Sequence, residues 1–366
     1  MPSPFKIRAG KISFVCTTLL AAGLLLTGCD MAHYYLQAVG GELDLLSRRR
    51  SISDLLADPV TPKPLRQRLS LAEKAVKFAV TDLALAPSGS FQSYADLSRP
   101  YAVWAVYATP AYAFDPVTWC FPVAGCMSYR GYFSPDDAHR SAEVLAHEGM
   151  DTYVTGAPAF STLGWFDDPL LNTFIDWPEP WLIGLIFHEL AHATLYVSGD
   201  TTFNESYAEA VSRIGVELWL QQSGQTKLLE KYRRYHQQRD ACLNLIQKSR
   251  ALLAVVYASR RTPAELLAVK THILKATRRT YHRMAANWGG GAACDSWFPP
   301  HLNNAHLVAL TTYSQWIPSL LALMAQEGGA ITQFHQSARS LGELPPPLRQ
   351  EQLRQWLHPA SPPAAF

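Results

Sequence analysis

The stretch Trp181-Leu-Ile-Gly-Leu-Ile-Phe-His188-Glu189-Leu-Ala-His192-Ala-Thr-Leu-Tyr196 places an HExxH motif inside an apolar segment that has the pattern of a helix. Residues four apart on a helix lie one turn above the other on the same face, so His188 and His192 can direct their rings at one ion. Two histidines at this spacing suit Zn²⁺, whose bonds to nitrogen are about 2.0–2.1 Å long. Glu189, one position further round the helix, can accept a proton from a water at the metal and so act as general base.

A catalytic zinc site has three protein ligands and one open position, so a third ligand is expected. The segment Asn204-Glu205-Ser206-Tyr207-Ala208-Glu209 lies in a second helix that we predict to begin at about Thr202. It resembles the helix that supplies the third ligand in the glutamate-type zincins, the gluzincins. Glu205 is therefore the predicted third ligand of one Zn²⁺ per chain. Glu209, one turn further along, is placed to accept the second ring N–H of a zinc-bound histidine.

Two other interpretations of these residues stay open. His188 and His192 could be satisfied core histidines on an amphipathic helix, with Glu205 in solvent. The chain could also bind the metal without catalysing a reaction.

Two further components of such a site are expected. An edge strand before the active-site helix would hold the substrate backbone, and residues 155–165 stand where it is expected, although they could equally form a plain turn. A donor to the developing oxyanion is expected downstream of the motif. By position the candidates are Tyr281, His282, His306 and Tyr313, and each could equally be a packing or surface residue.

The N-terminus has the pattern of an export signal. Basic residues between positions 6 and 11 precede an apolar run at 12–26, which is short for a membrane span and right for a signal peptide. The run ends in Leu26-Thr-Gly-Cys29, which resembles the lipobox of bacterial lipoproteins, so we predict a signal peptide at 1–28 and lipidation of Cys29. Asp30 favours retention at the inner membrane, facing the periplasm. The alternative is an ordinary cleaved signal or a short anchor in which Cys29 is incidental.

Export affects the interpretation of the other cysteines. After cleavage the chain holds Cys120, Cys126, Cys242 and Cys294 besides Cys29, and an even number in an oxidising compartment suggests up to two disulfides. Cys120 and Cys126 enclose a hairpin-like turn, so we favour that pair, with Cys242–Cys294 as the remainder. Four buried thiols are the alternative. A zinc cluster of cysteines is not expected, because the chain has no CxxC pair.

Composition excludes several classes of protein. The 366 residues carry 32 Lys+Arg against 30 Asp+Glu, a net charge of +2, so nothing suggests the basic field that nucleic-acid binding needs. Apolar runs are too short for a polytopic membrane protein. A content of 48% hydrophobic and 17% charged residues is typical of a folded chain.

The order of patterns along the chain indicates the fold class. Aromatic and β-branched residues between about 88 and 133 predict short strands, and another strand is expected at 151–154. From about 180 to 325 the chain has helical patterns, broken at Gly199, Gly224 and around Gly289. We therefore predict an α+β, predominantly α-helical protein with a small β region before the active-site helix. Residues 29–366 are expected to form one domain, with a loosely held, proline-rich tail at 345–366.

Together these segments resemble the bacterial family of predicted aminopeptidases, lipoproteins with an HExxH zinc site. The resemblance extends over nearly all of the mature chain, and the stretches that carry it are Tyr34-Tyr-Leu-Gln-Ala-Val39, Cys120-Phe-Pro-Val-Ala-Gly-Cys126, Tyr129-Arg-Gly-Tyr-Phe133, Ser161-Thr-Leu-Gly-Trp-Phe-Asp-Asp-Pro-Leu170, the HELAH and NESYAE segments, Asn303-Asn304-Ala305 and Tyr313.

The resemblance implies a zincin-like metallopeptidase domain with a peptide substrate and a lipid anchor in a bacterial membrane. It supports a metallopeptidase better than an aminopeptidase, because an exopeptidase needs an acidic group for the free amine and none is identified. The alternatives are an endopeptidase of envelope proteins, a non-catalytic envelope lipoprotein with a structural metal site, and an amidase that uses the same zinc water. The sequence does not address the oligomeric state.

Overall fold

The computed structural model describes residues 32–121, 125–159, 167–289, 293–312 and 314–357. Over these ranges the protein is an α+β structure in which helices predominate, which confirms the predicted fold class. A helix at residues 32–47 comes first. The elements that follow are β1 (Arg50–Ser51), α2 (Ile52–Ala57), α3 (Lys63–Thr81), β2 (Ser93–Ala95), β3 (Val103–Pro110), β4 (Trp119–Phe121), β5 (Gly125–Met127), β6 (Arg130–Tyr132), α4 (Pro135–His147), β7 (Met150–Ala157), β8 (Leu170–Leu171), α5 (Glu179–Thr194), α6 (Thr201–Gln222), α7 (Thr226–Tyr257), α8 (Pro263–Asn287), the 3₁₀ turn η1 (Asp295–Trp297), α9 (Asn304–Thr312), α10 (Ile317–Gln326), α11 (Ile331–Glu343) and α12 (Pro346–Leu357).

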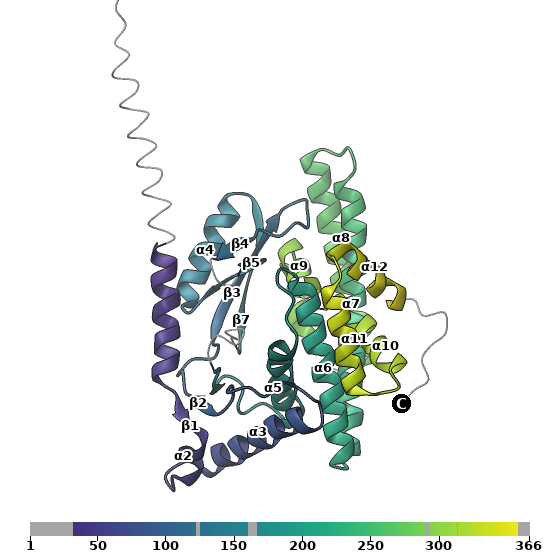
Figure 1. The fold of residues 1–366 in the computed structure, drawn as a ribbon. Coiled ribbons are helices and arrows are strands. Elements are labelled where there is room, and N and C mark those ends of the chain that lie inside the picture. The colour runs from purple at the N-terminus through teal and green to yellow at the C-terminus, as the bar shows by residue number, and fades with distance from the viewer. Residues whose placement is uncertain (1–31, 122–124, 160–166, 290–292, 313, 358–366) are drawn as a thin grey trace, which may run out of the picture.

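The sheet nearest the helical part of the molecule has the order β6-β3-β7 and is antiparallel throughout. Successive side chains of a strand point to opposite faces, so neighbouring residues of β3 contribute to different cores. Val106 belongs to the cluster with α4, whereas Tyr107 belongs to the cluster with α9. Helix α9 therefore lies between the sheet and the long helices of the other half (Figure 1).

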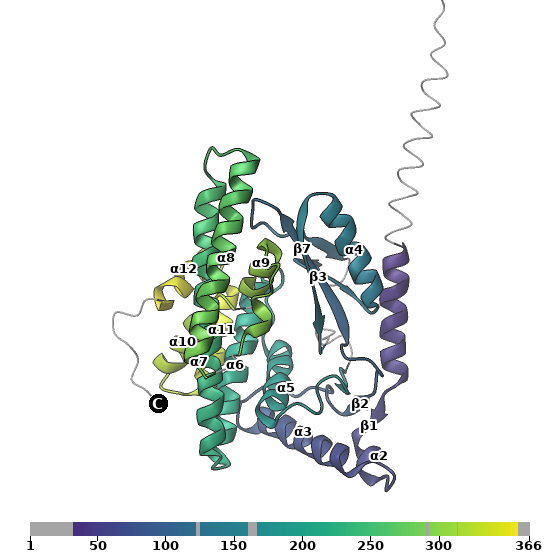
Figure 2. The same ribbon diagram turned by 180° about the vertical axis from the view of Figure 1, so that it is seen from behind.

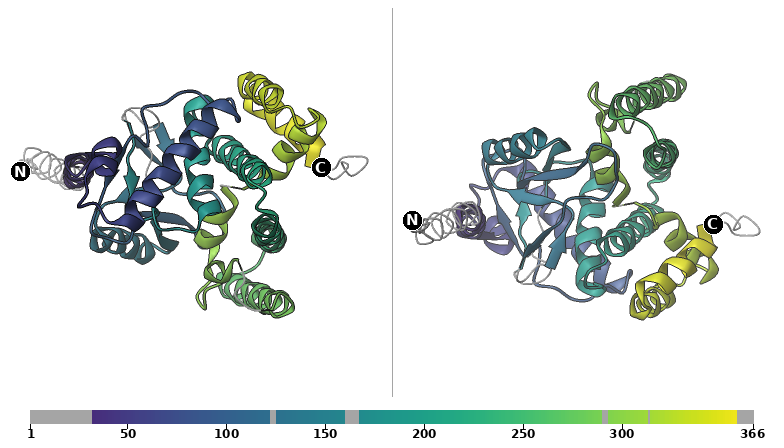
Figure 3. Two further views of the ribbon diagram at one scale, coloured as in Figure 1. Left: turned by 90° about the horizontal axis from the view of Figure 1, so that it is seen from below. Right: turned by 90° about the horizontal axis from the view of Figure 1, so that it is seen from above.

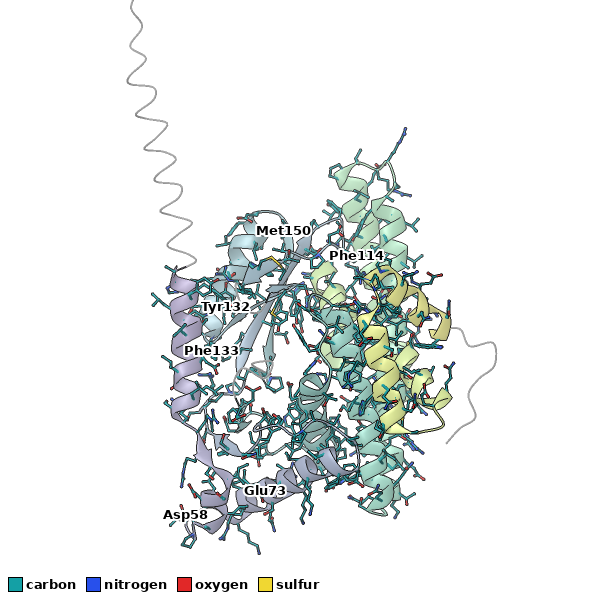
Figure 4. All side chains as sticks on the ribbon, viewed as in Figure 1. Asp58, Glu73, Phe114, Tyr132, Phe133 and Met150 are labelled. Carbon is teal, nitrogen blue, oxygen red and sulfur yellow. A yellow bond between two sulfur atoms is a disulfide. The ribbon has the colours of Figure 1, made fainter. Side chains whose placement is uncertain are left out.

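The helix at 32–47 packs against the outer side of this β region (Figure 4). The ring of Tyr34 lies 5.5 Å from that of Tyr132, edge to face. Gly41 allows a close approach, because a Cβ there would overlap the ring of Phe133. The first described helix is thus held by aromatic contacts to β6 and the residue after it.

The central core is formed by α5 and α6, which lie side by side (Figures 1 and 2). Their close approach depends on glycine: a Cβ on Gly215 would come within 2.7 Å of Phe187 and 2.5 Å of Leu83. One turn earlier on α6, Ser212 donates a hydrogen bond of 2.7 Å to the carbonyl of Gly184 on α5. Both helices are consequently fixed in register, which matters because they carry the predicted metal ligands.

Helices α7 and α8 form a long pair beside α6, and the Cys242–Cys294 disulfide ties α7 to the segment after α8 (Figure 2). Helices α10, α11 and α12 lie on the other side of α6 (Figure 3). Among the described ranges, we find no helix with both the length and the apolar character needed to cross a membrane.

The expectation of a loosely held tail from residue 345 is wrong for its first part. Residues 346–357 form α12, in which Leu353 is buried in the central core. Arg349 is also buried, because its guanidinium makes an ion pair of 3.0 Å with Asp200 at the start of α6. Residues 358–366, like the predicted signal peptide and Cys29, lie outside the described residues.

Candidate metal centre

The chain reversal between α5 and α6 brings the predicted ligands together. Helix α5 ends at Thr194, Leu195 is extended, and Gly199 takes a positive φ of 79° that favours glycine. Asp200 then caps α6 by accepting a hydrogen bond from the backbone N–H of Phe203. The first turns of α6 thereby return beside the end of α5.

Three side chains converge at this point with their ligand atoms together. Nε2 of His188 lies 3.3 Å from Nε2 of His192 and 3.3 Å from Oε2 of Glu205. Nε2 of His192 lies 3.8 Å from Oε1 of Glu205. The three residues form a group that could hold a metal ion, the one such group of His, Cys, Asp and Glu found in the described ranges.

These separations fit a tetrahedral ion. Two ligand atoms that are each about 2.0–2.2 Å from zinc at a tetrahedral angle lie about 3.3–3.6 Å apart. Two of the three measured separations have this value and the third is slightly larger, so a small side-chain movement completes the geometry. Two imidazoles and one carboxylate also leave a fourth position for a water or substrate.

The surroundings of the three ligands favour positive charge. Burial opposes protonation of His188, but its hydrogen bond to Glu205 and the carboxylates of Glu205, Glu189 and Glu209 outweigh burial and raise its pKa to about 9. Burial and the neighbouring His188 lower the pKa of His192 to about 4, so that ring is neutral, as a metal ligand must be. Surroundings that hold a proton on His188 would equally stabilise a divalent cation there.

Glu209 lies behind His188 and is itself held by a cation. Its Oε2 is 3.9 Å from Nδ1 of His188, and its Oε1 accepts a hydrogen bond of 3.0 Å from Nε of Arg213. Arg213 is buried and also binds both carboxylate oxygens of Asp240 on α7, at 2.9 and 3.0 Å. Burial opposes ionisation of Glu209, but Arg213, His236 and Arg239 outweigh it and lower its pKa to about 2. A permanently charged Glu209 can therefore orient the His188 ring.

Tyr129, just before β6, is a further candidate for this site that sequence reasoning did not select. Burial raises the pKa of Tyr129, and Tyr107 and the carboxylates of Glu205 and Glu189 raise it further. The rings of Tyr107 and Tyr129 pack together with their centroids 5.6 Å apart. Tyr129 thus keeps its proton and remains a hydrogen-bond donor. Its place in the segment Tyr129–Phe133, part of the family resemblance, was the available signal.

The predicted oxyanion donors have other contacts. Tyr281 stacks on Phe298 at a centroid distance of 4.1 Å, and its hydroxyl donates a hydrogen bond to Asp295. These contacts place Tyr281 in the cluster around α8 and η1. His282 is exposed on α8.

His306 stacks on Tyr153 at 4.0 Å, and its Nδ1 makes a 2.7 Å hydrogen bond to Asn303. These contacts give His306, like Tyr281, a packing role. Tyr313 lies outside the described residues.

Both predicted cysteine pairs are present, and the predicted edge strand is present with other bounds. Cys120 is bonded to Cys126, and Cys242 to Cys294. β7 pairs only with β3 within the described part of the sheet, so it is an edge strand, but it covers residues 150–157 rather than 155–165. Residues 160–166 lie outside the described residues.

The fold and the site define a predominantly helical α+β protein with a two-histidine, one-carboxylate group suited to a metal ion. A family model described as "Putative aminopeptidase" matches residues 33–353, and the chain belongs to this family. Searches of curated proteins and of solved structures returned no match. Membership of the family indicates peptidase activity.

Proposed function

We propose that the protein is a zinc-dependent peptidase in which His188, His192 and Glu205 bind one Zn²⁺. The separations of 3.3, 3.3 and 3.8 Å between their ligand atoms carry this proposal, together with membership of the aminopeptidase family. A zinc ion bound there would supply a water of lowered pKa and polarise the carbonyl of the scissile bond.

The chain's own residues supply the remaining chemistry. Glu189 follows the first histidine of the motif on α5 and serves as general base, taking the proton of the attacking water and passing it to the leaving amine. The Glu209–Arg213 pair holds His188 in the orientation that ligation needs. Tyr129 donates a hydrogen bond to the oxyanion that forms at the attacked carbonyl.

A specific observation bears on whether the enzyme removes single residues or cleaves within chains. An aminopeptidase needs a free carboxylate for the substrate amine. Among the described residues that line the cavity beside His188, the carboxylates are those of Glu189 and Glu209. Glu189 is the proposed base, and Glu209 is bound by Arg213. This favours an endopeptidase as the second candidate, although the family's name favours an aminopeptidase.

Hydrolysis assays test both the class and the mode of cleavage. We expect the mature chain, supplied with Zn²⁺, to hydrolyse short peptides, and Glu189→Gln to lower kcat by about 10²–10⁴ while the metal stays bound. Glu143→Gln, at an exposed position of α4, is the matched control and should leave kcat unchanged. Peptides with free and acetylated N-termini then separate the two modes, since an aminopeptidase cleaves only the free form.

Full activity in Glu189→Gln would refute the proposed base. If zinc binds but no peptide in a broad set is cleaved, the non-catalytic lipoprotein becomes the better account.

We also propose that Cys29 anchors the protein by lipid to a bacterial membrane, facing the periplasm, with Asp30 favouring the inner membrane. The helix at 32–47 supports this, because Leu36, Val39 and Leu43 lie along one side of it and are 57–74% exposed. An apolar stripe just after a lipid anchor suits the membrane interface. Radiolabelled fatty acid should be incorporated into the wild type in bacteria and not into Cys29→Ser.

A further inference from the structure

A cavity of about 330 Å³ lies beside the metal centre, between α5, α6 and α7. His188 and Glu189 form part of its wall, so the cavity adjoins the metal centre on the side of the proposed general base. Its size is at the lower end for small-molecule sites. It therefore suits one amino-acid residue rather than a longer segment.

The walls of the cavity are largely aromatic. Leu185 lies one turn and Trp181 two turns before His188–Glu189 on the same side of α5, and Trp177 precedes the helix. Across from them on α7, the ring of Tyr235 meets that of Trp181 edge to face at 5.3 Å. Trp177, Trp181 and Leu185 are only partly buried, although such side chains are usually enclosed in a core.

The charged side chains that line the cavity are Glu189, Glu209 and Arg239, and Glu189 is the proposed general base. Glu209 is bound by Arg213 at 3.0 Å and could bind another cation only by giving up that partner. Arg239 also lines the cavity, and its guanidinium donates to the Tyr235 hydroxyl at 3.1 Å and stacks over Trp297 at 4.4 Å. A lysine or arginine side chain would be repelled by Arg239, whereas an uncharged ring would pack against the aromatic walls.

We propose that this cavity binds an aromatic or large aliphatic side chain of the substrate, from a residue directly next to the cleaved bond. The inference rests on the proposed peptidase function and adds a substrate class to it. Burial of such a side chain favours cleavage over an alanine counterpart by about 10- to 100-fold in kcat/KM, because the apolar surface leaves water.

The test fills the cavity. Leu185→Trp places a larger side chain in the cavity. Leu267→Trp, at an exposed position of α8, is the matched control. The zinc-loaded mature chain is assayed on a set of peptides that carry Phe, Ala, Lys or Asp on either side of the cleaved bond and are otherwise identical. We expect Phe to exceed Ala by about 10- to 100-fold at one of the two positions in the wild type and the control, and this ratio to fall at least tenfold in Leu185→Trp.

A second readout does not require cleavage. Saturation-transfer NMR with N-acetyl-phenylalaninamide should show binding to the wild type and Leu267→Trp, and little or none to Leu185→Trp. If Leu185→Trp does not fold, Trp181→Ala, which removes one wall, should weaken both the preference and the binding.

The outcomes separate the two proposals. A Phe preference that persists in the filled cavity, or a preference for Lys or Asp, overturns the inference. If no peptide is cleaved, the peptidase function fails, and the NMR result alone decides: binding lost in Leu185→Trp supports the cavity assignment, and binding retained refutes it.

Discussion

Replacement of Arg213 by leucine should destabilise the protein by about 3–5 kcal/mol. Arg213 is buried, and its guanidinium neutralises Glu209 on one side and Asp240 on the other. Asp240 has a side chain that is 45% exposed, so water can replace its partner. Glu209 is more enclosed, at 26% exposed, and would lose the one cation that donates a hydrogen bond to it among the described contacts, which accounts for most of the cost.

The assay is urea unfolding followed by circular dichroism, with a chelator present so that metal binding does not add to the stability of the folded state. With a slope of about 3 kcal/mol per molar urea, a loss of this size lowers the midpoint by about 1 M or more. Arg213→Leu/Glu209→Gln removes the unpaired charge as well, and should recover most of the lost stability.

Metal affinity provides a second measurement, since Glu209 and Arg213 orient His188. Both the single and the double variant should bind Zn²⁺ about 10- to 100-fold more weakly than the wild type. A single variant whose stability is within about 1 kcal/mol of the wild type, which is the range of an exposed ion pair, would show that Arg213 is not needed to neutralise Glu209. So would a double variant as unstable as the single one.

Three further predictions concern other parts of the structure. Tyr129→Phe should leave the fold and zinc content intact and lower kcat by about 10²–10³ on a peptide substrate; an unchanged kcat would remove Tyr129 from the chemistry. Gly215→Ala should lower the free energy of unfolding by about 1–2 kcal/mol in urea, because its Cβ meets Phe187 and Leu83, and a gain would show that the helices can separate. Burial lowers the pKa of His306 to about 4 from about 6.5 in the unfolded chain, so the wild type should lose up to about 3 kcal/mol of stability as the pH falls from 7 to 4. His306→Gln should lack this part of the acid sensitivity when urea midpoints are compared at pH 7 and pH 4.5.

Local patterns in the sequence were sufficient to predict the fold class and to select the three side chains that the structure brings together, His188, His192 and Glu205. The spacing of His188 and His192 is a property of a single helix, and it places both rings on one face without knowledge of the rest of the chain. Glu205 could be predicted because only a short reversal separates its helix from the motif. Gly199 marked that reversal, and it does take a positive φ.

Contacts between distant segments could not be predicted in this way. Tyr129 packs where β3 and β7 meet α9, and its own neighbourhood in the sequence does not reveal that Glu205 and Glu189 raise its pKa. The proline-rich composition after residue 345 suggested a loose end, whereas Arg349 pairs with Asp200 and Leu353 enters the core. The candidates Tyr281 and His306 were chosen by position alone, and the structure places Tyr281 in the cluster around α8 and the His306 ring against Tyr153.

The most direct test of the central claim is the metal content of the mature chain, measured by mass spectrometry beside Glu205→Ala. We expect about one zinc per chain in the wild type and a strong reduction in the variant, because two histidines alone hold the ion weakly. As a control, Glu143→Gln should retain the wild-type content. A wild-type chain without zinc, after purification free of chelators and attempted reconstitution, would contradict the account.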